Sequence, residues 1–330
     1  MSGDFGHGGA LDRMQAAFPD APRPWIDLST GINPWPYPVT DVPPGALHHL
    51  PTGRDRDACR EAMAAAFGAD PESLLLAPGS ELLIRLLPTI VRYSHVIVLS
   101  PTYGDHAEVW RNAGCEVTET ADPLANAGQA DAIVVCNPNN PDGRRFTAAE
   151  LEQARAKQAE RGGWLIVDEA YADLTPAHSL AQAGGRDSLI ILRSFGKFFG
   201  LAGVRLGALI GPEPVRRRMS ERLGAWPVSG QALAIGARAY LDLGWQAETR
   251  IRLGAARDRL DRILTVAGLP VVGGCDLFRL VQVPDSKRLW QQLAERGIYV
   301  RCFDWSGILL RIGLPPDAEA EQRLAAALSP

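Results

Sequence analysis

The stretch AIVVCNPNNPDGRRFTAAELEQARAKQAERGGWLIVDEA, residues 132–170, decides the fold that this sequence predicts. Two short apolar runs, 132–136 and 164–169, flank a polar segment with the composition of a helix. Thr147 and Glu150 stand three positions apart and predict a capping box, so we expect the helix to begin directly after Thr147. A strand, a helix and a second strand in this order indicate two parallel strands joined by a crossover helix.

The same alternation continues on both sides of this stretch. Further apolar runs that predict strands occupy residues 74–78, 95–100, 189–194 and 205–211. Helical patterns accompany them at 54–68, from near Ser80, and up to about Asn112. Strands of continuous apolar character are typical of a mostly parallel sheet that is covered by helices. The sequence therefore predicts an α/β fold whose large domain is built on such a sheet.

The two ends of the chain have a different character. Residues 1–50 are rich in glycine and proline and predict an extended arm with loops. After a helical region at 214–268, apolar runs alternate with two further helices and predict a smaller α+β unit. We therefore expect an arm at 1–50 that contributes to the small domain and the active site, a large domain at 51–245, and a small C-terminal domain at 246–330.

Composition excludes several classes of function. The formal net charge is −4 and no long basic run is present, so a nucleic-acid partner is not expected. No apolar run is long enough to span a bilayer, and the N-terminus lacks the pattern of a secretory signal. The five cysteines are widely spaced, which indicates reduced thiols in the cytoplasm and no zinc or other metal site.

Lys197 is the first candidate for chemistry. It lies among glycines and phenylalanines in SFGKFFG, residues 194–200, in a chain with three lysines and thirty-one arginines. A partly apolar pocket with arginines nearby favours the neutral amine, which reacts with aldehydes. The alternative interpretation is a surface lysine on a glycine-rich loop. Phe198 stands where a phosphate-binding loop of an NTPase needs Ser or Thr, so that class is not expected.

Polar groups follow several of the other predicted strands. The Asp168 carboxylate suits a protonated ring nitrogen, although Asp after a strand is also a common helix N-cap. Asn140 lies in a proline-rich loop that can hold its side chain in place or can be an ordinary turn. Residues 79–81 begin a helix, where backbone N–H groups suit a phosphate, as at many strand–helix turns. Tyr103 can stack on a flat ring or belong to the core.

In this order and spacing, these residues resemble the fold-type I pyridoxal-phosphate enzymes, in the branch of the class I and II aminotransferases. The resemblance covers essentially the whole chain. It implies pyridoxal 5'-phosphate as the cofactor and three catalytic groups, namely Lys197 as the covalent tether, Asp168 at the ring nitrogen and Tyr171. The cofactor contacts that it implies are Gly79, Ser80, Glu81, Ser194 and Arg205 at the phosphate, Tyr103 stacked on the ring, and Asn140 and Tyr171 at its 3-hydroxyl.

Several stretches are similar to the branch of the family that decarboxylates L-threonine O-3-phosphate. They are residues 7–9, 27–38, 192–207, 226–233 and 273–280. This likeness implies that the products are carbon dioxide and (R)-1-aminopropan-2-ol O-2-phosphate, which supplies a linker in cobalamin biosynthesis. The family resemblance also implies a homodimer with a shared active site.

The resemblance also implies groups that bind the substrate. Arg311 is expected at the carboxylate and Arg301 at the phosphate, since a guanidinium pairs with both anions in a bidentate manner. His7 and Asn33 from the arm are further candidates. Structural ion pairs for the two arginines, and a purely structural arm, are the alternatives.

Two other functions remain open from the sequence. A histidinol-phosphate aminotransferase would share every cofactor residue and both arginines. Its usual tyrosine toward the partner subunit's cofactor phosphate is replaced here by Leu50. A non-catalytic regulator with this fold would carry a DNA-binding segment, and residues 1–50 show no such pattern. The sequence does not separate threonine phosphate from serine phosphate, because one methyl group changes binding by only about 1–3 kcal/mol.

Overall fold

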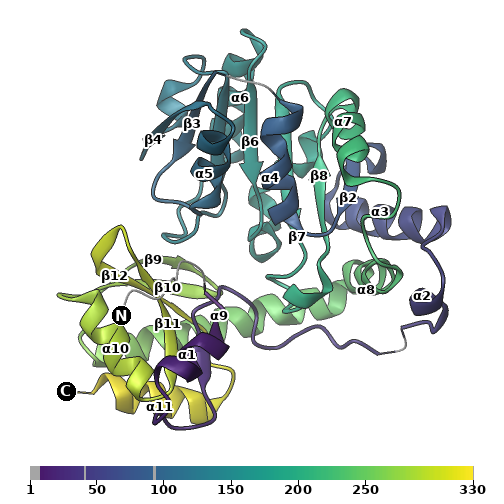
Figure 1. The fold of residues 1–330 in the computed structure, drawn as a ribbon. Coiled ribbons are helices and arrows are strands. Elements are labelled where there is room, and N and C mark those ends of the chain that lie inside the picture. Colours follow the sequence, from purple (N-terminus) through teal and green to yellow (C-terminus); the bar gives the residue numbers. More distant parts are fainter. Residues whose placement is uncertain (1–7, 41, 92–93, 330) are drawn as a thin grey trace. The chain divides into compact units, whose positions relative to one another are not determined.

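The computed structural model describes residues 8–40, 42–91 and 94–329 (Figure 1). The chain divides into two compact units. The larger unit comprises Pro36–Asn140 and Arg144–Gln246. The smaller unit comprises the described residues of Met1–Trp35 together with Pro141–Gly143 and Ala247–Pro330.

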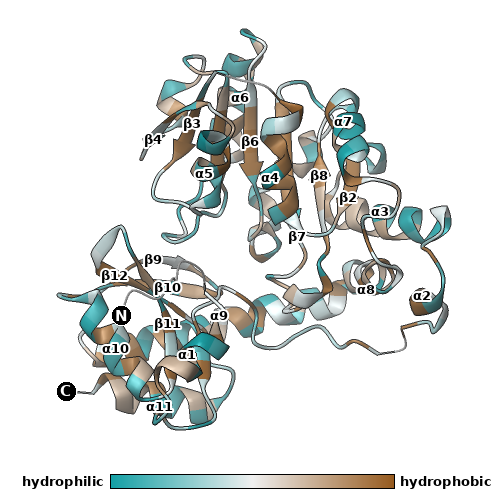
Figure 2. Ribbon diagram, in the orientation of Figure 1, coloured by the Kyte–Doolittle hydropathy of each residue, from teal (hydrophilic) through white to brown (hydrophobic). Residues whose placement is uncertain are grey.

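The larger unit is built on a seven-stranded sheet with the order β2-β8-β7-β6-β5-β3-β4. The strands are β2 Leu74–Ala77, β3 His95–Leu99, β4 Glu116–Thr120, β5 Ala132–Cys136, β6 Trp164–Asp168, β7 Leu189–Ser194 and β8 Gly207–Ile210. Only β8 runs antiparallel to its neighbours, so the prediction of a mostly parallel sheet is confirmed. Most of these strands are strongly hydrophobic (Figure 2), as expected for strands buried on both faces.

Strand β4 was not expected from the sequence. It pairs in parallel with β3 at the edge of the sheet, with Ile97 opposite Thr118. Its residues are mostly exposed. An edge strand buries little surface, so Glu116–Thr120 carries no apolar run that would predict it.

The larger unit also contains helices, most of which pack on this sheet or on each other. They are α2 Gly45–His48, α3 Gly53–Phe67, α4 Ser80–Ile90, α5 Asp105–Asn112, α6 Ala148–Ala159, α7 Glu213–Leu223 and α8 Gly230–Leu241. The capping box is present: Thr147 Oγ1 accepts from the Glu150 amide at 3.2 Å, and α6 begins at the next residue. Helix α3 ends as predicted at Gly68, whose φ of 66° is the left-handed conformation of a helix C-cap. Short 3₁₀ turns lie at Pro71–Ser73, Leu124–Asn126, Ala172–Leu174, Pro176–His178, Ala181–Ala183 and Ala202–Val204.

The core of the larger unit lies between the sheet and three adjacent helices, α4, α5 and α7 (Figure 1). Val98, Val134, Ile166 and Ile190 from neighbouring strands are at most 1% exposed, and Trp110 of α5 is also buried against them. This packing holds the strands in register, and therefore fixes where each strand ends.

The smaller unit contains a five-stranded sheet with the order β1-β11-β12-β10-β9. Its strands are β1 Ile26–Leu28, β9 Val271–Cys275, β10 Phe278–Gln282, β11 Ile298–Phe303 and β12 Ser306–Gly313. Its helices are α1 Leu11–Ala17, α10 Ser286–Glu295 and α11 Ala318–Leu328, and α9 Leu243–Val266 begins in the larger unit. In the described part of the chain, no helix has the length and apolar character that crossing a membrane requires.

The N-terminal segment differs from the extended arm that was expected for residues 1–50. It contains α1, α2 and strand β1, which pairs in parallel with β11 through Ile26 and Ile298. Three residues are too few to show a strand period in the sequence. The segment is also shared between the units, because Tyr37 belongs to the larger one and its amide donates to the carbonyl of Phe199 at 2.9 Å.

Candidate active site

The polar residues that the sequence singles out in the larger unit gather at one edge of its sheet. Strands β2, β3, β5, β6 and β7 all run in the same direction, so their carboxyl ends lie at that edge. The predicted site residues lie at these ends: Asp168 and Ser194 are the last residues of their strands, and Gly79, Tyr103 and Asn140 follow theirs. The fold therefore brings together groups that are more than a hundred positions apart in the chain.

The N-terminus of α4 and the side chain of Arg205 lie together and form a candidate anion site. Gly207 pairs with Ala77 on one side and with Ser194 on the other, which places the turn before α4 beside the end of β7. A Cβ at Gly79 would lie 2.9 Å from Nη2 of Arg205, and Gly79 has a φ of 93°. The guanidinium thus lies against the first amides of α4, where the helix dipole also attracts an anion.

Two backbone features hold this anion site in place. A Cβ at Gly207 would lie 2.9 Å from the amide nitrogen of Ser80 and 2.6 Å from the carbonyl oxygen of Arg193, so only glycine fits there. Arg205 adopts the left-handed conformation, with a φ of 54°, which is unusual outside glycine and is found at sites where the surrounding structure requires it. Gly207 was not expected from the sequence to have a role in the site.

Lys197 lies on a loop that is anchored by its aromatic neighbours. Phe195, Phe198 and Phe199 are fully buried, and the ring of Phe199 stacks on Trp245 with centroids 5.6 Å apart. A Cβ at position 196 would lie 2.8 Å from Cα of Ala202, so a glycine there lets the loop fold tightly. Lys197 itself is only half-buried. The phenylalanines therefore fix the loop, and the lysine is carried at a defined place at the end of β7.

Asp168 is buried at the end of β6 and is bonded to a histidine. Its Oδ2 lies 3.0 Å from Nε2 of His106, and both side chains are buried. Its Oδ1 accepts from the amide of Ala170 at 3.0 Å, so the carboxylate also stabilises the turn after the strand. His106 was missed in the sequence, although it stands only three residues after Tyr103 in SPTYGDH.

The loop before Asn140 is pinned by two other asparagines. Asn137 Oδ1 accepts from the amide of Phe146 at 2.9 Å. Asn139 is fully buried, donates to the carbonyl of Pro101 at 2.9 Å and accepts from Thr102 Oγ1 at 2.6 Å. These hydrogen bonds anchor the loop on both sides of Pro138. The two prolines of the loop suggested such a fixed backbone for Asn140. Tyr171, after β6, is also buried.

The Glu81 side chain is hydrogen-bonded to Tyr103 in this structure. Glu81 Oε2 accepts from the Tyr103 hydroxyl at 2.9 Å, and Glu81 Oε1 lies 2.6 Å from Nε of Arg85. A role for Glu81 at a phosphate would therefore come from its backbone amide near the start of α4. Burial, followed by the charges of Glu81 and Asp105, raises the pKa of the Tyr103 phenol, so this hydroxyl stays a donor.

A buried ion cluster lies behind the ends of β6 and β7. Arg193 is 2% exposed and donates to Glu169 Oε2 at 2.8 Å and to Asp173. Its guanidinium carbon lies 4.0 Å from the centroid of the Phe67 ring. Arg193 and Glu169 are the direct chain neighbours of Ser194 and Asp168, so this cluster ties the two strand ends to each other.

The predicted substrate residues lie in the smaller unit. Arg301 of β11 and Arg311 of β12 are directly opposite partners in an antiparallel pair. Arg311 is 6% exposed and its Nη2 donates to the carbonyl of Ser29 at 2.6 Å. Burial and the nearby charge of Arg311 lower the pKa of Arg301. Like charges opposite each other destabilise a sheet, so this arrangement suits an anionic ligand.

The arm contributes one described candidate to the smaller unit. Asn33 is 2% exposed, and its Oδ1 accepts from the amide of Trp35 at 2.9 Å. It belongs to the same unit as the two arginines. His7, the other candidate, lies outside the described residues.

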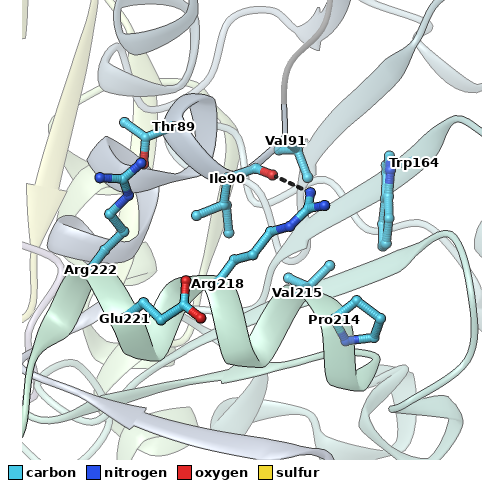
Figure 3. Close-up of a pocket in the computed structure, with 9 residues that line it drawn as sticks. All are labelled: Thr89, Ile90, Val91, Trp164, Pro214, Val215, Arg218, Glu221 and Arg222. Carbon is cyan, nitrogen blue, oxygen red and sulfur yellow. Dashed lines mark hydrogen bonds between the residues drawn. The ribbon is translucent and has the colours of Figure 1, made fainter.

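A cavity of about 680 Å³ in the larger unit lies away from the candidate site residues of that unit (Figure 3). It is formed by the end of α4, by α7 and by the first residue of β6. Its lining residues are Thr89, Ile90, Val91, Trp164, Pro214, Val215, Arg218, Glu221 and Arg222. Trp164 begins the strand that Asp168 ends, so the cavity lies toward the opposite edge of the sheet from the candidate site.

Comparison with known families accounts for this arrangement. The model of the family "Aminotransferase class I and II" matches residues 44–328. The chain belongs to this family. Two similar members are called threonine-phosphate decarboxylase. That of Sinorhizobium sp is 42% identical over 100% of this chain and 99% of its own length. That of Pseudomonas aeruginosa is 42% identical over 98% of this chain and 96% of its own length.

A solved structure of the family shows the same fold. It is the histidinol-phosphate aminotransferase from Sinorhizobium meliloti in complex with pyridoxal-5'-phosphate, with a TM-score of 0.80 and 20% identity over 96% of this chain and 93% of that one. Family membership confirms the fold class expected from the sequence.

Proposed function

We propose that this protein is a threonine-phosphate decarboxylase that uses pyridoxal 5'-phosphate. It would convert L-threonine O-3-phosphate to (R)-1-aminopropan-2-ol O-2-phosphate and carbon dioxide for cobalamin biosynthesis. The observation that carries this proposal is the 42% identity, over nearly the full length, to two proteins of that name. Curated relatives called histidinol-phosphate aminotransferase are more distant, for example 30% identical over 84% of this chain.

The residues of the larger unit fit the cofactor. A phosphate suits the turn at Gly79 and Ser80, where glycine leaves room and the Arg205 guanidinium lies close. Ser194 and the amide of Glu81 would be the other contacts of the phosphate.

The ring of the cofactor would be held by other residues of the larger unit. Tyr103 would stack on the ring, while Asn140 and Tyr171 would bond its 3-hydroxyl. Lys197 would be the covalent tether, because its amine lies on the anchored loop at the end of β7.

When bound, pyridoxal phosphate withdraws the electron pair that is left at the substrate α-carbon as carbon dioxide departs. Asp168 supports this by holding a proton on the ring nitrogen, because a buried carboxylate stabilises a cation next to it. His106, at 3.0 Å, orients that carboxylate. Both side chains are buried, so water does not compete for these hydrogen bonds.

Lys197 would move the last proton. After the carboxylate has left, the amine delivers a proton to the α-carbon as a general acid. The position of the amine depends on the loop, whose phenylalanines are fully buried. A fixed position for the amine also fixes the face of the α-carbon that receives the proton.

Two arginines would orient the substrate. We assign Arg311 to the carboxylate and Arg301 to the phosphate, with His7 and Asn33 as further contacts. Binding both anions would fix the orientation of the substrate carboxylate beside the cofactor, and this orientation would decide which bond at the α-carbon breaks. The opposed positions of the two guanidinium groups on β11 and β12 support this assignment.

We further propose a cytoplasmic homodimer. Leu47 and Leu50 on and just after α2 are 65% and 64% exposed, and Trp226 before α8 is 57% exposed. Large apolar side chains exposed in this way suit a subunit interface. Leu50 stands where related aminotransferases carry the tyrosine that reaches the partner subunit, so that contact would be absent here.

The decisive experiment gives cofactor-loaded protein L-threonine O-3-phosphate without a keto acid. Sustained release of carbon dioxide, with the amine product in equal amount, is the expected result. Turnover only when 2-oxoglutarate accompanies histidinol phosphate would make the protein an aminotransferase. The same assay with L-serine O-phosphate measures how much the methyl group contributes.

A further inference from the structure

The hydroxyl of Tyr103 lies at the centre of a charged cluster. It donates to Glu81 Oε2 at 2.9 Å and lies 3.3 Å from Asp105 Oδ2. Arg85 bridges the two carboxylates, with Nε 2.6 Å from Glu81 Oε1 and Nη2 2.5 Å from Asp105 Oδ2. One guanidinium therefore holds both acceptors that face one phenol.

This cluster joins three pieces of the candidate site. Glu81 and Arg85 lie in the first two turns of α4, which also forms the anion site, and Asp105 begins α5. Tyr103 lies in the short connection between β3 and α5. Asp105 is 3% exposed. Its buried carboxylate is stabilised by the positive charge of Arg85 and by the tyrosine hydroxyl.

The ring of Tyr103 is also held along its side. It meets the ring of His106 edge-on, with centroids 6.0 Å apart and an interplanar angle of 86°. His106 in turn bonds Asp168. The two ends of the contact set act differently: the carboxylates hold the hydroxyl tip of the ring in place, and the histidine limits rotation of the ring about its Cβ–Cγ bond.

We propose that Arg85 is a positioning residue for the reaction: by holding Glu81 and Asp105, it fixes the hydroxyl tip of Tyr103 and therefore the place of the ring against the cofactor. This inference rests on the proposed function, because it takes Tyr103 as the stacking group. A tyrosine that only packed in the core would not need two carboxylates and a shared guanidinium at its hydroxyl. Because the ring is already held in place, less conformational entropy is lost when the cofactor binds.

Four variants test the proposal through a double-mutant cycle. They are Tyr103→Phe, Arg85→Gln, the double variant, and Arg111→Gln as a control. Tyr103→Phe keeps the stacking ring and removes only the hydroxyl. Arg111 is the matched control, since it forms an exposed ion pair with Glu119 on α5 and β4. Each protein is stripped of cofactor and titrated with pyridoxal 5'-phosphate, following the Kd and the visible circular dichroism of the bound cofactor, together with the Tm.

We expect each single variant at positions 103 and 85 to raise the Kd about fivefold and to change the dichroism in the same way. The double variant should be no worse than either single one, because both remove the same restraint. Arg111→Gln should leave the Kd and the dichroism unchanged. Additive effects of the two substitutions, or a lower Tm for Arg85→Gln with unchanged dichroism, would overturn the proposal.

The wild-type titration separates this inference from the proposed function. If the wild-type protein does not bind the cofactor, the proposed function fails and the stacking role of Tyr103 fails with it. If the wild-type protein binds the cofactor and decarboxylates its substrate while the cycle is additive, only the positioning role of Arg85 is wrong.

Discussion

Asp168 and His106 are joined by a hydrogen bond of 3.0 Å between Oδ2 and Nε2, although they stand 62 positions apart in the sequence. Asp168 ends β6 and His106 lies in the first turn of α5. The second oxygen of Asp168 accepts from the amide of Ala170. Both oxygens of the carboxylate are therefore engaged, and its direction is fixed before any ligand arrives.

His106→Ala should lower kcat by about tenfold or more, because loss of an orienting partner of this kind reduces activity on that order. It should also weaken cofactor binding, measured by titration of the stripped protein. His95→Ala is the control. His95 lies on β3, and its Nε2 forms a hydrogen bond with the exposed hydroxyl of Thr118. An unchanged kcat for His106→Ala would show that Asp168 needs no partner.

Gly79→Ala should weaken cofactor binding. The new methyl group would lie 2.9 Å from the Arg205 guanidinium, and the φ of 93° is unfavourable for alanine. Gly203→Ala is the matched control, because nothing lies within 4 Å of a Cβ at that nearby position. Equal Kd values for pyridoxal phosphate in the two variants would contradict the assignment of this turn to the phosphate.

Lys197→Ala should abolish turnover and covalent attachment of the cofactor. Treatment of the cofactor-loaded wild-type protein with borohydride should leave one pyridoxyl phosphate group on the peptide that contains Lys197, as read by mass spectrometry. The chain has only two other lysines, Lys157 and Lys287, so the labelled position is unambiguous. Label on either of those peptides would refute the role of Lys197.

Arg311→Ala should raise KM strongly and leave the absorbance of the bound cofactor intact. Removing a bidentate ion pair with a substrate anion costs about 2–5 kcal/mol, or roughly thirtyfold or more in affinity. Arg301→Ala should raise KM less for an analogue that lacks the phosphate than for the full substrate. Loss of bound cofactor in Arg311→Ala would instead indicate a structural role.

Arg193→Met should destabilise the fold by about 3–5 kcal/mol, because it leaves Glu169 and Asp173 as buried charges without their cation. The free energy of unfolding in urea measures this loss. Arg186→Met is the control, since Arg186 forms an exposed ion pair with Glu152. A loss similar to that of the control would show that Arg193 does not stabilise the strand ends.

Much of the larger unit could be predicted from the sequence. Its central strands are continuous apolar runs, and its helices have caps such as Thr147 and Gly68 that act within a few residues. The short strand β1 and the polar edge strand β4 could not be predicted, because their partners come from distant parts of the chain. A strand that buries little surface has no need of a hydrophobic pattern.

The sequence by itself determined which groups are the candidates for chemistry: one unusual lysine, an aspartate at a strand end, and glycines at the start of a helix. These signals are local, since composition and spacing within a few residues set the backbone conformation. Only the tertiary structure decided which side chains meet. The pairing of His106 with Asp168, the three side chains around the Tyr103 hydroxyl and the opposition of Arg301 and Arg311 all depend on strand register. Register is set by packing of the whole sheet, and no short stretch of sequence contains it.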